Sequence, residues 1–448
     1  MTRPLLLLFV LALSAGAEER RYVDVPENHK KPNGRQLSLE VRIVPAKEKR
    51  DADPIFFLAG GPGQVAVTTI EWVSEIFAEA NQTRDIVFAD YRGATERNLL
   101  ACKTKASEAD PAGYFVDLFS GDVLARCRDE LSEKWDLTQY HTSNIVEDVE
   151  LVRRKLGYRQ INLYGSSYGT RVAHEYMRRY PANVRGAILD GATAPSFIMP
   201  GHYAPDAEKS LQRVFALCAE DPSCHAKYPE LEKEWARLLD EASARGIEVV
   251  LPNNVRAKVS RGLFGEVMRN TLYSQDSYVL LPKMIHLAAN GDRAMFARQA
   301  LRVAQNSRYL VTGMFVAVTC TDDLPRLDVA KARQAARGTL LGSYRIDVQL
   351  AACRIFPRGE RDVRASQPLR VSVPTLILSG ELDPVTSPRF GDELVETLPN
   401  AKHVVIPYAS HGKGTPCPNK ILNDFVKAGS VEKVDTSCVA GTPRPVFE

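Results

Sequence analysis

The pentapeptide at positions 165–169 carries the residue types best suited to covalent chemistry in this chain. It reads Gly-Ser-Ser-Tyr-Gly, which fits the Gly-x-Ser-x-Gly pattern and places Ser167 at its centre. An apolar strand candidate over 161–164 precedes it and a helical pattern over 170–180 follows it. The two glycines permit a sharp turn that exposes the serine hydroxyl. We therefore predict that Ser167 is a nucleophile, with a plain glycine-rich turn as the alternative.

A serine hydroxyl is a poor nucleophile unless a histidine accepts its proton and a carboxylate orients that histidine. Asp383 and His411 each lie on a short loop that follows an apolar strand candidate, and both come after Ser167 in the chain. We predict that these two residues are the acid and the base. Glu381 lies on the same loop as Asp383 and is the competing carboxylate.

Acyl transfer to a serine also requires two N–H donors that stabilise the oxyanion. The backbone of Tyr168, the residue directly after the serine, is one predicted donor. The segment 60–63 reads Gly-Gly-Pro-Gly after a strand candidate, and Gly61 is the predicted second donor. A simple Gly-Pro turn is the alternative for this segment. A phosphate-binding loop would end in Gly-Lys-Ser or Gly-Lys-Thr, which is missing here.

The remaining patterns indicate how these residues are positioned. Strand candidates lie at 22–26, 37–44, 55–58, 86–89, 161–164, 184–189, 371–378 and 403–406. The first two predict a hairpin, and the others alternate with helical patterns, which predicts a mostly parallel sheet covered by helices on both faces. One such helix is predicted over 143–156, with Ser143 as its N-cap and Gly157 as its end.

The helical texture between the sixth and seventh strand candidates predicts an insertion into the sheet domain. We expect a first part of the core at 18–195, a helical cap at 196–365 and a second part of the core at 366–448. A chain of 448 residues is long enough for such an arrangement. The sequence shows no internal repeat and no low-complexity segment.

Composition limits the compartment and the partners. The formal net charge is only +3 and 44% of residues are apolar, so nothing indicates nucleic-acid binding. Residues 1–17 combine one positive charge, a short apolar run and a small-x-small end, which predicts a cleaved signal peptide. The run is too short to span a bilayer, and no nearby cysteine suggests a lipid anchor. We expect a secreted or periplasmic protein without a stable membrane anchor; a membrane-retained N-terminus is the alternative.

Eight cysteines, an even number, suggest disulfides in an oxidising compartment. Neighbours in sequence suggest the pairs Cys102–Cys127, Cys218–Cys224, Cys320–Cys353 and Cys417–Cys438. Eight cysteines nevertheless allow about 105 connectivities, and buried free thiols are the alternative. No metal-binding motif appears, so we predict neither a metal nor another cofactor.

Several of these motifs together resemble the secreted serine aminopeptidases of the α/β-hydrolase fold, the proline iminopeptidase and tripeptidyl aminopeptidase group. The similar segments are 60–63, 90–93, 98–102, 189–191, 316–322 and 380–386. The chain departs from the group's pattern at Ala59, at Ala94-Thr95 and at Arg97, which affects a loop next to the site. The resemblance implies an α/β-hydrolase fold with a helical cap that sets substrate choice.

The resemblance also implies a secreted serine exopeptidase that acts on peptides with a free N-terminus. Such an enzyme must recognise an α-ammonium group, so a carboxylate outside the triad is needed. Asp322 and Asp323 are the predicted carboxylates, with a solvated acidic turn as the alternative. A secreted carboxylesterase or lipase on the same fold is the competing function, and a silent binding protein is another. The sequence makes no prediction of oligomeric state.

Overall fold

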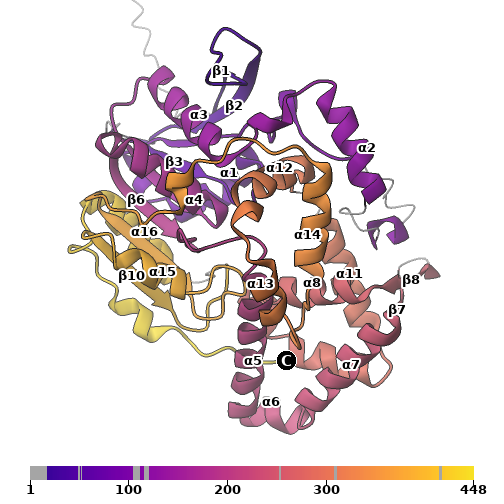
Figure 1. The fold of residues 1–448 in the computed structure, drawn as a ribbon. Coiled ribbons are helices and arrows are strands. Elements are labelled where there is room, and N and C mark those ends of the chain that lie inside the picture. Colours follow the sequence, from indigo (N-terminus) through magenta and orange to yellow (C-terminus); the bar gives the residue numbers. More distant parts are fainter. Residues whose placement is uncertain are drawn as a thin grey trace, which may run out of the picture.

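A computed structural model describes residues 18–48, 51, 53–103, 111–115, 121–251, 254–306, 310–412 and 416–448. The predicted signal peptide at 1–17 lies outside the described residues. Figure 1 shows a central sheet with helices around it and a group of helices that projects to one side. We call residues 196–365, which contain that group, the cap segment.

The central sheet has eight strands in the order β1-β2-β4-β3-β5-β6-β9-β10. They are β1 (Glu19–Pro26), β2 (Gln36–Val44), β3 (Ile55–Leu58), β4 (Ile86–Ala89), β5 (Ile161–Ser166), β6 (Val184–Asp190), β9 (Thr375–Gly380) and β10 (Ala401–Ile406). The predicted hairpin of β1 and β2 is confirmed, and β4, β3, β5, β6, β9 and β10 run parallel to one another. Strands β3 and β4 are buried throughout, as expected for parallel strands covered on both faces.

Helices on the two faces of the sheet alternate with the strands, as the sequence predicted. They are α1 (Ile70–Ile76), α3 (Thr142–Lys155), α4 (Tyr168–Arg179), α15 (Arg389–Val395) and α16 (Pro416–Ala428), whereas α2 (Gly121–Ser132) packs against the cap segment. Helix α4 is the most enclosed, because every residue from Tyr168 to Met177 is buried. It therefore carries its first residues into the interior between the sheet and the cap segment.

Helix α3 corrects one detail of the prediction. It begins at Thr142, so Ser143 lies inside the helix and is not its N-cap. His141 holds the N-cap position without a side-chain cap, and the carboxylate of Asp322 accepts the backbone N–H of Thr142 at 3.0 Å instead. Asp322, 180 positions away in the chain, thus accepts a free N–H group at the start of α3, where the sequence predicted a local cap by Ser143. Gly157, with φ of +79°, follows the helix end as predicted.

The cap segment is mostly helical, as predicted. Its helices are α5 (Tyr203–Glu220), α6 (Pro222–Lys227), α7 (Leu231–Arg245), α8 (Arg261–Thr271), α9 (Gln275–Tyr278), α10 (Leu281–Ala289), α11 (Ala294–Asn306), α12 (Thr312–Asp322), α13 (Val329–Ala335) and α14 (Tyr344–Ile355). A two-stranded antiparallel sheet, β7 (Ile247–Val250) and β8 (Arg256–Val259), was not predicted. Its strands have only four residues each, too few for a clear alternating pattern.

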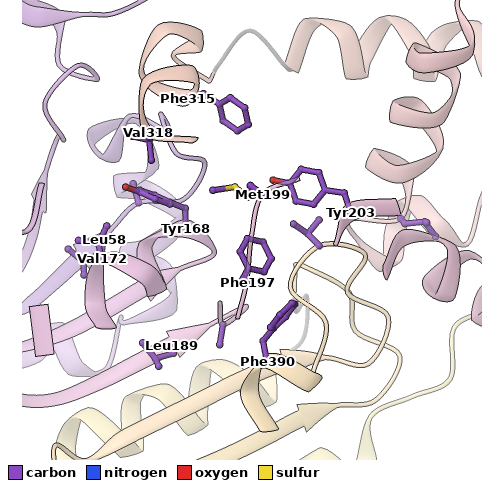
Figure 2. Close-up of a cluster of buried hydrophobic side chains, with 14 of the residues drawn as sticks. Leu58, Tyr168, Val172, Leu189, Phe197, Met199, Tyr203, Phe315, Val318 and Phe390 are labelled. Atoms are coloured by element: carbon purple, nitrogen blue, oxygen red, sulfur yellow. The ribbon is translucent and has the colours of Figure 1, made fainter. Parts of the chain in front are cut away.

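Buried aromatic side chains join the cap segment to the core. Figure 2 shows Tyr168 of α4 close to Val318 of α12, with Val172 of α4 beside Leu58 and with Phe197 farther along toward Phe390. The rings of Phe197 and Phe390 lie 5.0 Å apart in an edge-to-face arrangement. Such contacts remove apolar surface from water and hold the two parts in one fixed relation.

Disulfides link the four cysteine pairs that the sequence suggested. One of them, between Cys320 and Cys353, ties α12 to α14 inside the cap segment. No free cysteine occurs among the described residues. Within the same part of the chain, no helix is both long and apolar enough to cross a membrane.

Candidate active site

Ser167 lies between β5 and α4 with φ of 54° and ψ of −121°, a conformation that non-glycine residues rarely adopt. Its N–H donates to the carbonyl of Asp190 at 2.8 Å, which holds the turn against the end of β6. Gly169 is required here, because a Cβ atom at this position would lie 1.9 Å from the carbonyl oxygen of Leu58. The strained backbone and the close helix–strand approach are what a nucleophile elbow needs.

The loops after β9 and β10 bring Asp383 and His411 together. Asp383 Oδ2 lies 2.8 Å from His411 Nδ1. The other oxygen, Oδ1, accepts the backbone N–H groups of Val385 and Thr386 at 2.9 and 2.8 Å, and the Thr386 hydroxyl donates to Oδ2 at 2.7 Å. The carboxylate is thus fixed in orientation and suited to accept a hydrogen bond from the Nδ1–H of His411. That tautomer leaves Nε2 of His411 as a proton acceptor.

His411 also lies next to the serine turn. A Cβ atom on Gly191 would be 3.2 Å from Cε1 of His411, and Gly191 directly follows the carbonyl that holds Ser167. The ring of Tyr273, from the cap segment, lies 5.2 Å from the His411 ring. The carbonyl of Tyr273 accepts the N–H of Gly412 at 2.9 Å. The core and the cap segment therefore both position the histidine.

Glu381, the competing carboxylate, is engaged elsewhere. Its Oε1 accepts from Nε of Arg213 at 3.0 Å, and its Oε2 accepts the N–H of Tyr408 at 2.9 Å. Neither contact involves His411. The geometry therefore favours Asp383 over Glu381 as the partner of the histidine.

The segment 60–63 approaches the serine as an oxyanion loop should. A Cβ atom on Gly60 would lie 3.3 Å from Cβ of Ser167. The N–H of Gly60 already donates to Oε1 of Gln64 at 2.9 Å, whereas Gly61, with φ of +108°, lines the cleft beside the site. Tyr168 is the first residue of α4, and N–H groups in the first turn of a helix have no intrahelical acceptor. Gly61 therefore lies on the loop next to the serine, and Tyr168 begins the helix that follows it.

The predicted ammonium-binding role of Asp323 is wrong, because its side chain is completely buried. Its two oxygens accept from Nη1 and Nη2 of Arg171 at 2.9 and 2.8 Å, and Oδ1 also accepts the N–H of Met199 at 3.0 Å. Burial alone would lower the pKa of Arg171, but Asp323 raises it above its ordinary value. The pair links α4 to the cap segment.

Asp322 has a structural role as well. Its Oδ2 accepts both the N–H and the hydroxyl of Thr142, at 3.0 and 2.6 Å. The same hydroxyl lies 2.8 Å from the phenol oxygen of Tyr168. Asp322 thereby supports the start of α4 through Thr142. It lines a small separate cavity together with Arg171 and does not line the cleft beside Gly61.

That cleft lies between the oxyanion loop and the cap segment and has a volume of about 270 Å³. Its described lining includes Gly61 and Tyr273, the two residues that connect it to the serine and the histidine. The charged side chains among the described lining residues are Glu266, Arg269 and Arg345. They come from α8 and α14, which are more than 70 positions apart in the chain.

Glu266 is the cleft carboxylate that sequence reasoning missed. Its Oε2 accepts from Nε and Nη2 of Arg269 at 3.2 and 2.8 Å, and Nε of Arg345 lies 3.5 Å from its Oε1. Burial raises the pKa of Glu266, but the two arginines outweigh it and hold the pKa below its ordinary value. The only available signal was a Glu-x-x-Arg pair on a helix whose buried residues are mostly apolar, and such pairs are common on helix surfaces.

Within the described ranges, no three His, Cys, Asp or Glu side chains gather in a way that could hold a metal ion.

A sequence family described as the alpha/beta hydrolase fold matches residues 53–412. The chain belongs to the α/β-hydrolase family. It is a serine hydrolase of that family, with the serine turn, the strand order and the strand-end loops described above.

Curated relatives of this α/β-hydrolase include peptidases. The chain is similar to the serine protease Hip1 of Mycobacterium tuberculosis, with 26% identity over 459 aligned residues that cover 92% of this chain and 86% of Hip1. It is 29% identical to the tripeptidyl aminopeptidase of Streptomyces lividans over 193 residues, which cover 39% of this chain and 35% of that enzyme. The crystal structure of a proline iminopeptidase from Mycobacterium smegmatis aligns over 91% of this chain and 98% of its own, with 13% identity and a TM-score of 0.42.

Proposed function

We propose that this α/β-hydrolase is a secreted serine exopeptidase that cleaves peptides near a free N-terminus. The observation that carries the proposal is the carboxylate of Glu266 in the cleft beside Gly61. An aminopeptidase needs such a group for the substrate's α-ammonium, whereas an esterase has no use for it. Similarity to a serine protease and to a tripeptidyl aminopeptidase supports the same activity.

In the proposed reaction, Oγ of Ser167 attacks the carbonyl carbon of the scissile peptide bond while Nε2 of His411 takes the hydroxyl proton of the serine. The carbonyl oxygen becomes an oxyanion that accepts hydrogen bonds from the backbone N–H groups of Gly61 and Tyr168. His411 then gives its proton to the leaving amine, the C–N bond breaks, and an acyl-enzyme remains. Water attacks this ester with His411 again as the base, which releases the N-terminal segment and restores the serine.

Asp383 keeps His411 in the reactive tautomer and stabilises its imidazolium form. Its own contacts with Val385 and Thr386 allow it to do this without a change of position. The elbow holds the backbone of Ser167 in one conformation. The site is therefore preorganised for acyl transfer.

Glu266 replaces Asp322 and Asp323 as the proposed partner of the substrate N-terminus. An ammonium group that enters the cleft can compete with Arg269 and Arg345 for the two oxygens of Glu266. The predicted signal peptide and the four disulfides support secretion into an oxidising compartment.

The test compares peptide amides with a free N-terminus against the same peptides after N-acetylation. We expect acetylation to lower kcat/KM by about 10- to 100-fold, because a charge-assisted hydrogen bond is lost. Ser167→Ala should abolish both activities, which guards against a contaminating peptidase. Equal cleavage of free and acetylated peptides, or faster cleavage of neutral acyl esters than of any peptide, would replace the exopeptidase with an endopeptidase or an esterase.

A further inference from the structure

In the described lining of the cleft beside the serine, positively charged side chains outnumber negatively charged ones. Among the described residues that line it, Arg269 and Arg345 supply two guanidinium groups and Glu266 supplies one carboxylate. The three side chains are only 8 to 13% exposed. Charges that are largely removed from water interact strongly with an ion of opposite sign, so an excess of one positive charge favours an anionic ligand.

The geometry places both guanidinium groups around one position. Arg269 reaches Oε2 of Glu266 and Arg345 approaches Oε1, so the carboxylate lies between them. Both guanidinium groups also lie against the ring of Tyr203, at 5.0 and 5.7 Å from its centre. Tyr203 is almost completely buried and forms a fixed wall for the pair. Arginine presents several N–H donors in one plane, which suits two-point binding of a carboxylate.

The charged group is also close to the reacting atoms. Nη1 of Arg269 donates to the hydroxyl of Tyr273 at 2.6 Å, and the ring of Tyr273 lies 5.2 Å from that of His411. A single aromatic side chain thus separates the arginine from the histidine. A ligand carboxylate held by Arg269 and Arg345 would belong to a substrate whose scissile bond is only a few atoms away.

We propose that the cleft selects peptide substrates that bring a carboxylate to Arg269 and Arg345. This inference rests on the proposed exopeptidase function and names its substrate class. The carboxylate comes from an Asp or Glu side chain in the N-terminal segment, or from the free C-terminus of a short peptide. Glu266 lies between the two arginines and is the proposed partner of the ammonium group, so the complete site is complementary to a substrate that carries both charges.

The first experiment uses the wild-type enzyme. Tripeptide chromogenic amides that carry Glu, Gln or Lys at each of the three positions in turn are compared by kcat/KM. Gln matches Glu in size and lacks its charge. We expect Glu to exceed Gln by about 10- to 100-fold at one position, and Lys to be the poorest there. A second arm compares short peptides that end in a free carboxylate with their C-terminal amides, which identifies the source of the carboxylate.

The second experiment removes one positive charge. Arg345→Met keeps an unbranched apolar side chain and loses the guanidinium group. The ratio of kcat/KM for the Glu peptide to that for the Gln peptide should therefore fall to about threefold or less. The matched control is Arg333→Gln, which alters an arginine of α13 that is 52% exposed and pairs with Asp347 away from the cleft. This control should retain the full preference.

Equal rates for Glu and Gln at every position, together with equal rates for C-terminal acids and amides, would overturn the proposal. A preference that survives in Arg345→Met at full strength would overturn it as well. The wild-type series decides the question even if Arg345→Met fails to fold. Failure of the exopeptidase function would appear separately, as equal rates for free and acetylated N-termini, because the two ratios are measured on different substrate pairs.

Discussion

Asp323 allows a sharp test, because its sequence-based role and its structural role predict opposite results. The structure buries its carboxylate completely and gives it three hydrogen bonds, two from Arg171 and one from the N–H of Met199. The side chain of Arg171 is itself only 10% exposed. Removal of the carboxylate would leave a guanidinium group buried without its counter-ion.

For Asp323→Ala we expect a loss of about 3–5 kcal/mol in the free energy of unfolding, the usual result of breaking a buried ion pair. Unfolding a chain of 448 residues has an entropy of about 0.9 kcal/mol/K, so the melting temperature should fall by roughly 3–5 °C. Asp323→Asn keeps an acceptor and most of the shape, and should lose about half as much.

The matched control replaces both partners by apolar residues of similar size, as Arg171→Met with Asp323→Leu. This double variant should regain most of the stability, because no buried charge is left unpaired. The assays are urea unfolding followed by tryptophan fluorescence, and kcat/KM for free and acetylated peptides below the transition. A variant Asp323→Asn with wild-type stability and a reduced preference for free N-termini would refute the structural role.

Three further predictions follow from the core. Asp383→Asn should lower kcat by about 10⁴-fold and Glu381→Gln by less than about threefold, since only Asp383 contacts the histidine; similar losses in both would contradict the assignment. Gly169→Ala should yield little folded protein in a secretion assay, because its Cβ would overlap the carbonyl of Leu58; normal yield would refute the tight packing. Burial raises the pKa of Asp90 from 3.8 to about 7. Between these two pH values the folded state keeps a proton on Asp90 that the unfolded state has lost. The free energy of unfolding should therefore fall as pH rises from 3.8 to about 7, by up to about 4 kcal/mol in total. Asp90→Asn should remove this loss, so its urea midpoint should exceed that of wild type most at pH 8. An equal difference between the two midpoints at pH 4 and at pH 8 would count against the prediction.

The sheet could be predicted from the sequence because each of its strands is a local pattern. Buried parallel strands need continuous apolar runs, and the turn at Ser167 needs glycines at 165 and 169, where any side chain would meet backbone atoms. The loops with Asp383 and His411 follow from the same rule, since the carboxyl ends of parallel strands meet at one edge. The cysteine pairs were suggested by proximity in sequence, and the structure joins the same pairs.

What the sequence alone determined is therefore the hydrolase core, whose reactive residues are carried by short motifs with their own backbone requirements. Only the tertiary structure decided which carboxylates serve the ligand and which serve the fold. Asp323 was predicted from the sequence to bind the substrate, yet packing places Arg171 against it. Glu266 reads as half of an ordinary helix pair, yet α14 brings Arg345 beside it and opens both to the cleft. Charge and burial at such positions depend on neighbours from distant segments, and no local pattern encodes those neighbours.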